Sequence, residues 1–142
     1  MTETLDLLPK YQRLYFLLKE RGIDWDPETG EAVYYRGQAY IICAVRDNTL
    51  ALLDDLADIP LTEEALLYVE NWETDPTLIW IPRLEGLLRV IWERTSLHPI
   101  MTPGIEAARR VWQVLHPACD PIIARSLQEA LLELAIRVLE VE

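Results

Sequence analysis

Apolar side chains in residues 120–142 recur at helical spacing along two neighbouring stripes. The first stripe comprises Ile123, Leu127, Leu131, Leu134 and Val138, and the second comprises Leu132, Ile136 and Leu139. A helix that is polar on only a thin strip is normally buried on more than one side. The pattern therefore predicts one long terminal helix over 120–142. We expect the first stripe to be covered within the chain, and the second stripe, Leu132, Ile136 and Leu139, to form a homodimer interface.

Helical spacing also occurs in earlier parts of the chain. It predicts helices over residues 5 or 9 to 21, 47–57, 62–73, 82–95 and 103–115. Pro9 is compatible with a helix only in its first turn, and Gly22 stands where a left-handed residue ends one. A capping residue followed by proline recurs at 75, 102 and 120, and each pair indicates the start of a new element.

A short β-hairpin is predicted near residues 31–44. Residues 31–35 and 38–44 are rich in aromatic and β-branched side chains, and Arg36-Gly37 between them is a plausible two-residue turn. Residues 38–45 also fit a helix that continues toward Leu52 and Leu56, and a short apolar run does not distinguish the two. Together these patterns predict a mainly α fold: a single compact domain over 1–142 with about five or six helices and one small hairpin.

Length and composition agree with one globular domain. The chain has 142 residues, and 51 % of them are hydrophobic, which supports a packed core. No apolar run approaches the ~20 residues that span a bilayer. The first residues lack the basic and apolar regions of a signal peptide. We therefore expect a cytoplasmic protein.

Charge is distributed unevenly along the chain. The formal net charge is −11, and the segment 47–75 contains nine acids and no base. Such a field repels nucleic acid and anionic membranes and would favour a basic protein partner, although a solvated acidic face is the simpler explanation. Candidate partner-binding residues are five acids of this segment and two tryptophans in predicted turns, which suit interface centres: Asp54, Asp55, Asp58, Glu63, Glu64, Trp25 and Trp80.

The strongest candidate for metal chemistry is the pair His116 and Cys119. Their spacing suits two zinc ligands, but a closed site needs four, and the only other histidine and cysteine are the distant His98 and Cys43. Two free thiols that act as small hydrophobic residues are the simpler interpretation. The acids at 54, 55 and 58 lack the regular loop of a calcium site. We therefore expect no metal, no cofactor and no catalytic residue.

These observations predict a non-enzymatic protein–protein interaction protein, such as an adaptor, a chaperone-like protein or a regulatory subunit. Its partner would be a basic protein, and the protein itself would be a homodimer. Arginine outnumbers lysine 11 to 2, and Arg109-Arg110 in the less acidic half would suit carboxylates of a second subunit. The alternative is a small-ligand-binding protein or enzyme. Its aromatic pocket would lie between hairpin and helices and would be lined by Tyr34, Tyr35, Tyr40 and Trp25.

Overall fold

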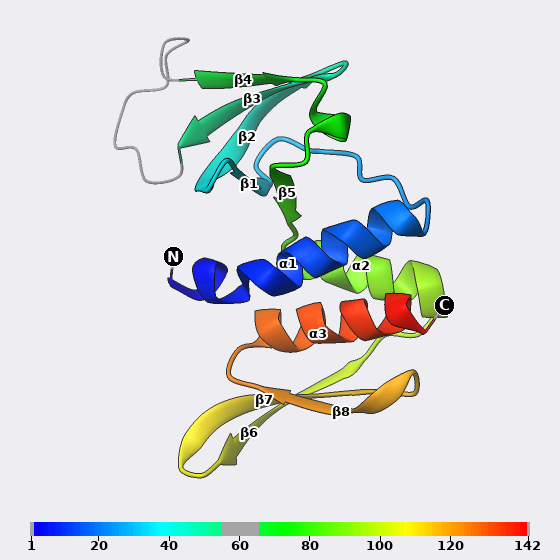
Figure 1. The fold of residues 1–142 in the computed structure, drawn as a ribbon. Coiled ribbons are helices and arrows are strands. Elements are labelled where there is room, and N and C mark those ends of the chain that lie inside the picture. Colours follow the sequence, from blue (N-terminus) through cyan, green and yellow to red (C-terminus); the bar gives the residue numbers. More distant parts are fainter. Residues whose placement is uncertain (1, 55–65, 142) are drawn as a thin grey trace. The chain divides into compact units, whose positions relative to one another are not determined.

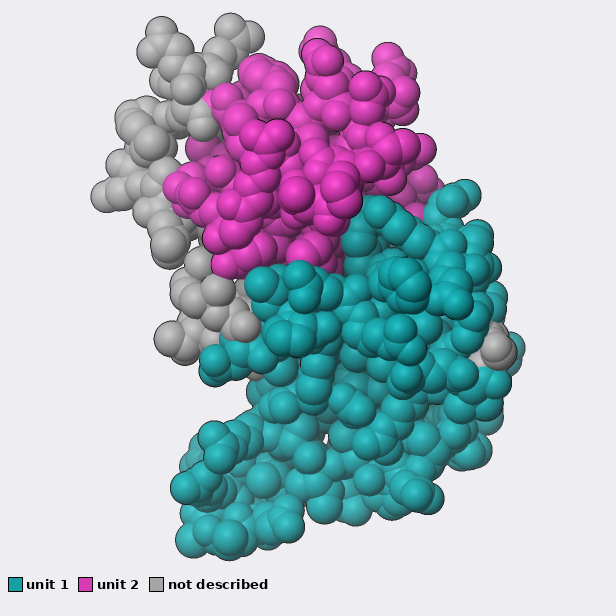
Figure 2. Space-filling model, viewed as in Figure 1, with its two compact units in different colours: residues 1–24, 82–142 teal, residues 25–81 magenta. Residues whose placement is uncertain are grey.

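The computed structural model describes residues 2–54 and 66–141, and the chain divides into two compact units (Figures 1 and 2). Unit 1 comprises residues 1–24 and 82–142, and unit 2 comprises residues 25–81. Unit 2 is therefore an insertion between the first helix of unit 1 and the rest of it. The single domain predicted from chain length stays a prediction, because compactness alone does not show whether each unit folds by itself.

Unit 1 is a layered arrangement of helices and one sheet (Figure 1). Its elements are α1 (Thr2–Glu20), α2 (Leu84–Thr95), β6 (Ile100–Glu106), β7 (Arg109–His116), β8 (Cys119–Ala124) and α3 (Leu127–Glu140). The three strands are antiparallel in the order β6-β7-β8. α3 packs on β7 and β8 on one side and on α1 and α2 on the other.

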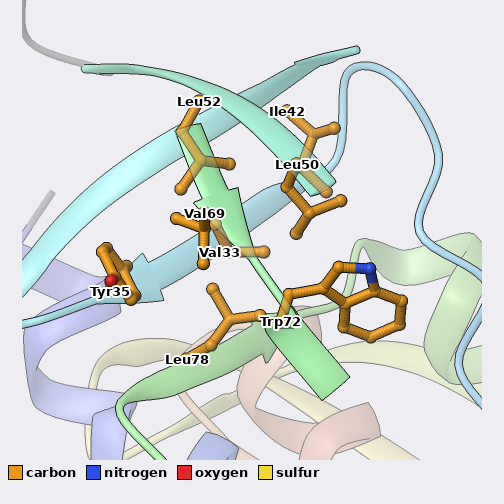
Figure 3. Packing of buried hydrophobic residues seen from close by; sticks show 8 residues of the cluster. All are labelled: Val33, Tyr35, Ile42, Leu50, Leu52, Val69, Trp72 and Leu78. Carbon is orange, nitrogen blue, oxygen red and sulfur yellow. The ribbon is translucent and has the colours of Figure 1, made fainter. Parts of the chain in front are cut away.

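Unit 2 is a five-stranded antiparallel sheet of order β4-β3-β2-β1-β5. Its elements are β1 (Ala32–Tyr35), β2 (Gln38–Arg46), β3 (Thr49–Asp54), β4 (Leu66–Glu70), the short 3-10 helix η2 (Trp72–Thr74) and β5 (Leu78–Ile81). One apolar cluster fills its core, and Figure 3 shows that its side chains come from all five strands and η2: Val33, Tyr35, Ile42, Leu50, Leu52, Val69, Trp72 and Leu78.

The ends of α1 and α3 follow from local signals. After α1, the Ile23 amide donates to the Leu18 carbonyl at 2.9 Å and the Gly22 amide to the Lys19 carbonyl at 3.1 Å, while Gly22 has φ of 70°. These are the two bonds of a Schellman cap, which confirms the predicted role of Gly22. At α3, the Ser126 hydroxyl accepts the Glu129 amide at 3.1 Å.

The predicted mainly α fold is wrong, because the protein is a mixed α/β protein. The described residues form three α-helices (35%) and eight strands (39%). The predicted helix 103–115 is instead the β6–β7 hairpin, and the first residues of the predicted helix 120–142 form β8. In β7, Val114 is buried by strand alternation, although Val111 and Leu115 also satisfy a helical spacing.

Two further predicted helices are also strands. Residues 47–57 supply β3, and residues 62–73 supply β4 and the start of η2, while residues 55–65 lie outside the described part of the chain. Leu50 and Leu52 point into the core of unit 2 at a spacing of two, which is a strand pattern within an apolar run. The predicted hairpin near 31–44 is confirmed as β1–β2, and residues 38–45 are a strand.

The helices over 82–95 and near the C-terminus are confirmed as α2 and α3. α1 begins at Thr2, so Pro9 lies inside the helix and not in its first turn. Proline removes one backbone hydrogen bond and disfavours the preceding turn. Packing of α1 on α3 compensates for that loss, since Leu7, Leu14 and Leu18 of α1 are buried.

Candidate functional site

Nearly the entire net charge of the protein belongs to unit 2. Residues 25–81 contain 12 acids and two bases, for a net charge of −10. Unit 1 contains 12 acids and 11 bases, for a net charge of −1. The acidity of the chain is therefore a property of unit 2 and not of unit 1.

The predicted acidic site is only partly within the described residues. Asp54 ends β3, and its carboxylate accepts a hydrogen bond from the Gln38 side-chain amide of β2. Asp55, Asp58, Glu63 and Glu64 lie outside the described residues. Several acids of unit 2 that the sequence did not single out as site residues are exposed: Asp26, Glu28, Asp47, Glu70 and Glu73.

Three of these exposed acids belong to neighbouring segments. Asp47 lies in the β2–β3 turn, Glu70 ends β4, and Glu73 is in η2. Thr49, two residues after Asp47, is the cross-strand partner of Glu70. The Trp72 amide donates to the Asn48 carbonyl at 3.5 Å, which joins η2 to the same turn. Asp47, Glu70 and Glu73 therefore form an acidic corner at this end of the sheet.

Asp75 follows the acidic corner and is also held ionised. Its carboxylate accepts the Thr77 hydroxyl at 2.6 Å and the Thr77 amide at 2.9 Å. These two hydrogen bonds hold the pKa of Asp75 below its ordinary value, because they stabilise the charged form. These contacts lie in the turn between η2 and β5, so the Asp75-Pro76 pair precedes a strand and not a helix.

Trp25 and Trp80, proposed as exposed anchors, pack inside unit 2. Their rings stack with centroids 5.5 Å apart, and Trp80 is buried. The carboxylate of Glu31 accepts the Trp25 indole N–H at 3.3 Å and the Trp80 indole N–H at 2.8 Å. It also accepts the Glu28 amide at 2.7 Å. The two tryptophans and Glu31 therefore stabilise the loop before β1. Trp25 is only partly buried, whereas the burial of Trp80 does not favour a role as an exposed anchor.

The indole N–H of Trp72 is buried without a hydrogen-bond partner. Trp72 meets Trp25 edge to face, with centroids 5.2 Å apart and planes at 75°. The edge-to-face contact is itself a favourable arrangement of two aromatic rings and helps to hold Trp72 in the core of unit 2.

The four aromatic residues of the predicted pocket belong to unit 2, and three of them take part in its core packing. Tyr35 belongs to the core of unit 2, and Tyr40 and Trp25 pack against that core. The Tyr35 and Tyr40 rings meet edge to face at 6.4 Å. Tyr34, on the opposite face of β1, is also buried.

His116 and Cys119 are cross-strand partners at the β7–β8 turn, but the imidazole is already committed. Its Nδ1 accepts the Ala118 amide at 3.0 Å, so Nε2 carries the proton and faces the Leu97 carbonyl and the Thr95 hydroxyl, each at 3.2 Å. His116 thus fastens the turn to the end of α2. Among the described residues, no group of three or more His, Cys, Asp or Glu side chains could hold a metal. Cys43 and Cys119 are free thiols.

Leu132, Ile136 and Leu139, the predicted dimer interface, are buried within unit 1. α3 lies between the sheet and the other two helices, so apolar residues on nearly its whole circumference are covered within the chain. These three residues therefore face the interior of unit 1, and the homodimer stays a prediction.

Exposed apolar side chains occur instead on β6 and its surroundings. Six large hydrophobic residues of unit 1 between positions 92 and 123 are exposed: Trp92, Leu97, Ile100, Met101, Ile105 and Ile123. Sequence reasoning missed this surface because it assigned residues 103–115 to a helix whose apolar face would be buried. Strand alternation in residues 100–106 was the available signal.

Comparison of the chain with protein-family models, with curated proteins and with solved structures finds no match. Among the described helices, none is long and apolar enough to cross a membrane.

Proposed function

We propose that this chain is a non-enzymatic interaction protein that binds a basic protein partner through unit 2. The observation that supports the proposal is the segregation of charge: a net charge of −10 on unit 2 and −1 on unit 1. A charge that only kept the protein in solution would need no such concentration in one unit.

The acidic corner is the part of unit 2 that best suits a basic surface. Asp47, Glu70 and Glu73 are exposed and are carried by a turn, a strand end and a 3-10 helix of one sheet. Carboxylates held at short spacing on a rigid sheet attract cationic side chains and accelerate encounter at low salt. The binding should therefore weaken as ionic strength rises, because exposed charges are screened beyond about 10 Å at 0.1 M salt.

Affinity capture with neutralised variants tests the proposal. In one variant, Asp47→Asn, Glu70→Gln and Glu73→Gln remove three charges from unit 2. In a matched control, Glu85→Gln, Glu93→Gln and Glu106→Gln remove three exposed charges from unit 1. We expect wild-type protein and the control to capture the same basic proteins from the native organism, and the unit 2 variant to lose them.

Equal loss in both variants would point to net charge alone and would contradict a binding surface on unit 2. Unchanged capture by the unit 2 variant would also contradict a binding surface on unit 2. So would capture by wild-type protein that persists at about 1 M salt, because charges are then screened beyond about 3 Å.

A further inference from the structure

The sheet of unit 1 is only partly covered by its helical layer. α3 packs on β8 and β7. The cross-strand partners Val114 and Ile122 are buried and therefore lie on the side of the sheet that α3 covers. All seven residues of the edge strand β6 are exposed. The helical layer thus ends before the third strand.

An apolar strip of β6 lies on that same side of the sheet. Met101 is the cross-strand partner of the buried Val114, and alternation places Pro103 and Ile105 on the side of Met101. Trp112, the partner of Pro103, continues the strip onto β7. Ile105 is 79% exposed, the largest exposure among the large hydrophobic side chains described. A continuous strip of exposed apolar side chains is unusual on a protein surface that contacts only water.

A hollow adjoins the strip. Its volume is about 580 Å³, and it lies between the start of α1, the end of β8 and the start of α3, with Leu7, Lys10, Ala124 and Ser126 among its lining residues. Ala124 is the cross-strand partner of Trp112, which joins the hollow to the strip. Figure 2 shows a recess in unit 1 on the side of the projecting β6–β7 hairpin. The apolar strip is therefore one wall of a concave surface.

The charges around this surface have a positive balance. Arg110 is the cross-strand partner of Ile105, and Arg125 lines the hollow. Neither arginine forms an ion pair with a carboxylate of the described residues. Lys10 pairs with Glu129 at 3.5 Å, and Asp6 is the other acid of the lining. The two arginines outnumber the one remaining acid, so this surface suits the carboxylates of a partner.

We infer that an amphipathic helix of a partner protein, with acidic residues beside its apolar stripe, docks over β6 and continues the helical layer next to α3. Helix-in-groove docking matches an apolar strip within a concave surface. Addition of a strand to the edge of β6 is disfavoured, since Pro103 has no amide hydrogen to offer. A bilayer is disfavoured because the strip faces a recess and not the outside of a convex tip.

Peptide selection on the full chain tests this inference. The probe is a phage-displayed library of helical peptides, each about five turns long, with leucines at helical spacing and randomised acidic, basic and neutral residues elsewhere. We expect enriched peptides to be acidic. Their affinity should fall about tenfold or more, or about 1.4 kcal/mol, in the Ile105→Asp variant, and it should also fall in the Arg110→Glu variant.

Ile100→Asp is the matched control, because Ile100 is 63% exposed on the same strand but lies on the opposite face. It should bind the peptides as wild type does, and far-UV circular dichroism should show all variants folded. Failure to enrich helical peptides, enrichment of basic ones, or equal loss in the two isoleucine variants would overturn the inference. Two other results would overturn it if no peptide binds: binding to phosphatidylserine vesicles that Ile105→Asp abolishes, or self-association in ultracentrifugation that Ile105→Asp abolishes.

Discussion

Two alanines close the β6–β7 hairpin in a backbone conformation that glycine and asparagine normally supply. Ala107 has φ of 52° and Ala108 has φ of 64°, and Glu106 and Arg109 pair on either side. Two successive positive φ values define a type I′ turn, whose twist matches that of the flanking strands. A side chain with a Cβ atom pays about 1–2 kcal/mol in the left-handed region. In the hairpin that carries Ile105, pairing of β6 with β7 therefore offsets the conformational strain of the turn.

Replacing this turn should therefore stabilise the protein. We expect Ala107→Asn together with Ala108→Gly to raise the free energy of unfolding by about 1 kcal/mol, as measured by urea denaturation. Ala118→Gly in the β7–β8 turn is the control, because Ala118 does not have a positive φ. Glycine there should give no gain, and an equal increase in both variants would show that the left-handed alanines cost nothing.

Glu133 on α3 makes the stability of unit 1 dependent on pH. Its carboxylate lies 3.1 Å from Lys10 Nζ and 3.2 Å from Arg137 Nε. Burial disfavours its charged form, but the hydrogen bond and charge of Lys10, assisted by Arg137, outweigh burial and hold the pKa of Glu133 below its ordinary value of 4.5. A lowered pKa in the folded state contributes stability above the unfolded value, and that stability is lost as pH falls through the folded value.

Lys10→Met should consequently cost about 0.5 kcal/mol at neutral pH, since the pair is partly exposed. The difference from wild type should shrink as pH falls below the ordinary Glu pKa of 4.5 and Glu133 takes up a proton. Lys19→Met is the control for removal of one positive charge, because Lys19 lies over the Tyr15 ring at 4.3 Å. A gap between Lys10→Met and wild type that stays constant over this pH range would contradict the role of Glu133.

At the scale of elements, the strands that were predicted are those with recognisable turns. β1–β2 was recognised because Arg36-Gly37 supplies a glycine at a position that needs positive φ. The hairpins of the second sheet turn at Ala107-Ala108 and Pro117-Ala118, neither of which contains glycine or asparagine. Without a turn signal, apolar residues 111 and 115 fit a helix as well as a strand, and only pairing across the sheet decides between them.

Both edges of the three-stranded sheet carry a proline. Pro103 lies in β6 and Pro121 in β8, where the pairing with β7 shifts register between Val114 and His116. The sequence suggested that Thr102-Pro103 and Asp120-Pro121 begin helices, because proline suits a first turn. Edge strands offer proline the same freedom, since one side of the strand makes no ladder bond. These prolines also limit pairing with strands of other molecules.

Some features of the candidate sites could be predicted from the sequence, and others depended on the fold. The acidity of 47–75 was visible from composition, and its assignment to an inserted sheet needed the fold. The stacking of Trp25 on Trp80 could not be predicted, because both indoles bind the carboxylate of Glu31 only when loop and strand come together. The buried character of α3 was predictable from its pattern, whereas what covers Leu132 and Ile136 was not.

For the whole molecule, the tryptophans allow a direct test of the predicted single domain. Trp25, Trp72 and Trp80 belong to unit 2, and Trp92 and Trp112 to unit 1. If the chain is one domain, the fluorescence of a Trp92→Phe, Trp112→Phe variant and its far-UV circular dichroism should report one thermal midpoint. Separate midpoints would show that the units unfold independently. The same variant unfolded with urea provides a second measurement.

The packing of α1 on α3 has a consequence for synthesis on the ribosome. The Arg21 guanidinium at the end of α1 donates to the Leu139 carbonyl at 3.1 Å across 118 residues of chain. Translation at roughly 5–20 residues per second separates the two helices by on the order of 6–24 s. Unit 2 is contiguous and leaves the ribosome within that interval, so it can acquire its sheet first. During the same interval the buried side of α1, with Leu14 and Leu18, has no partner from α3. The apolar side of the first helix is therefore exposed in the nascent chain until α3 has been synthesised.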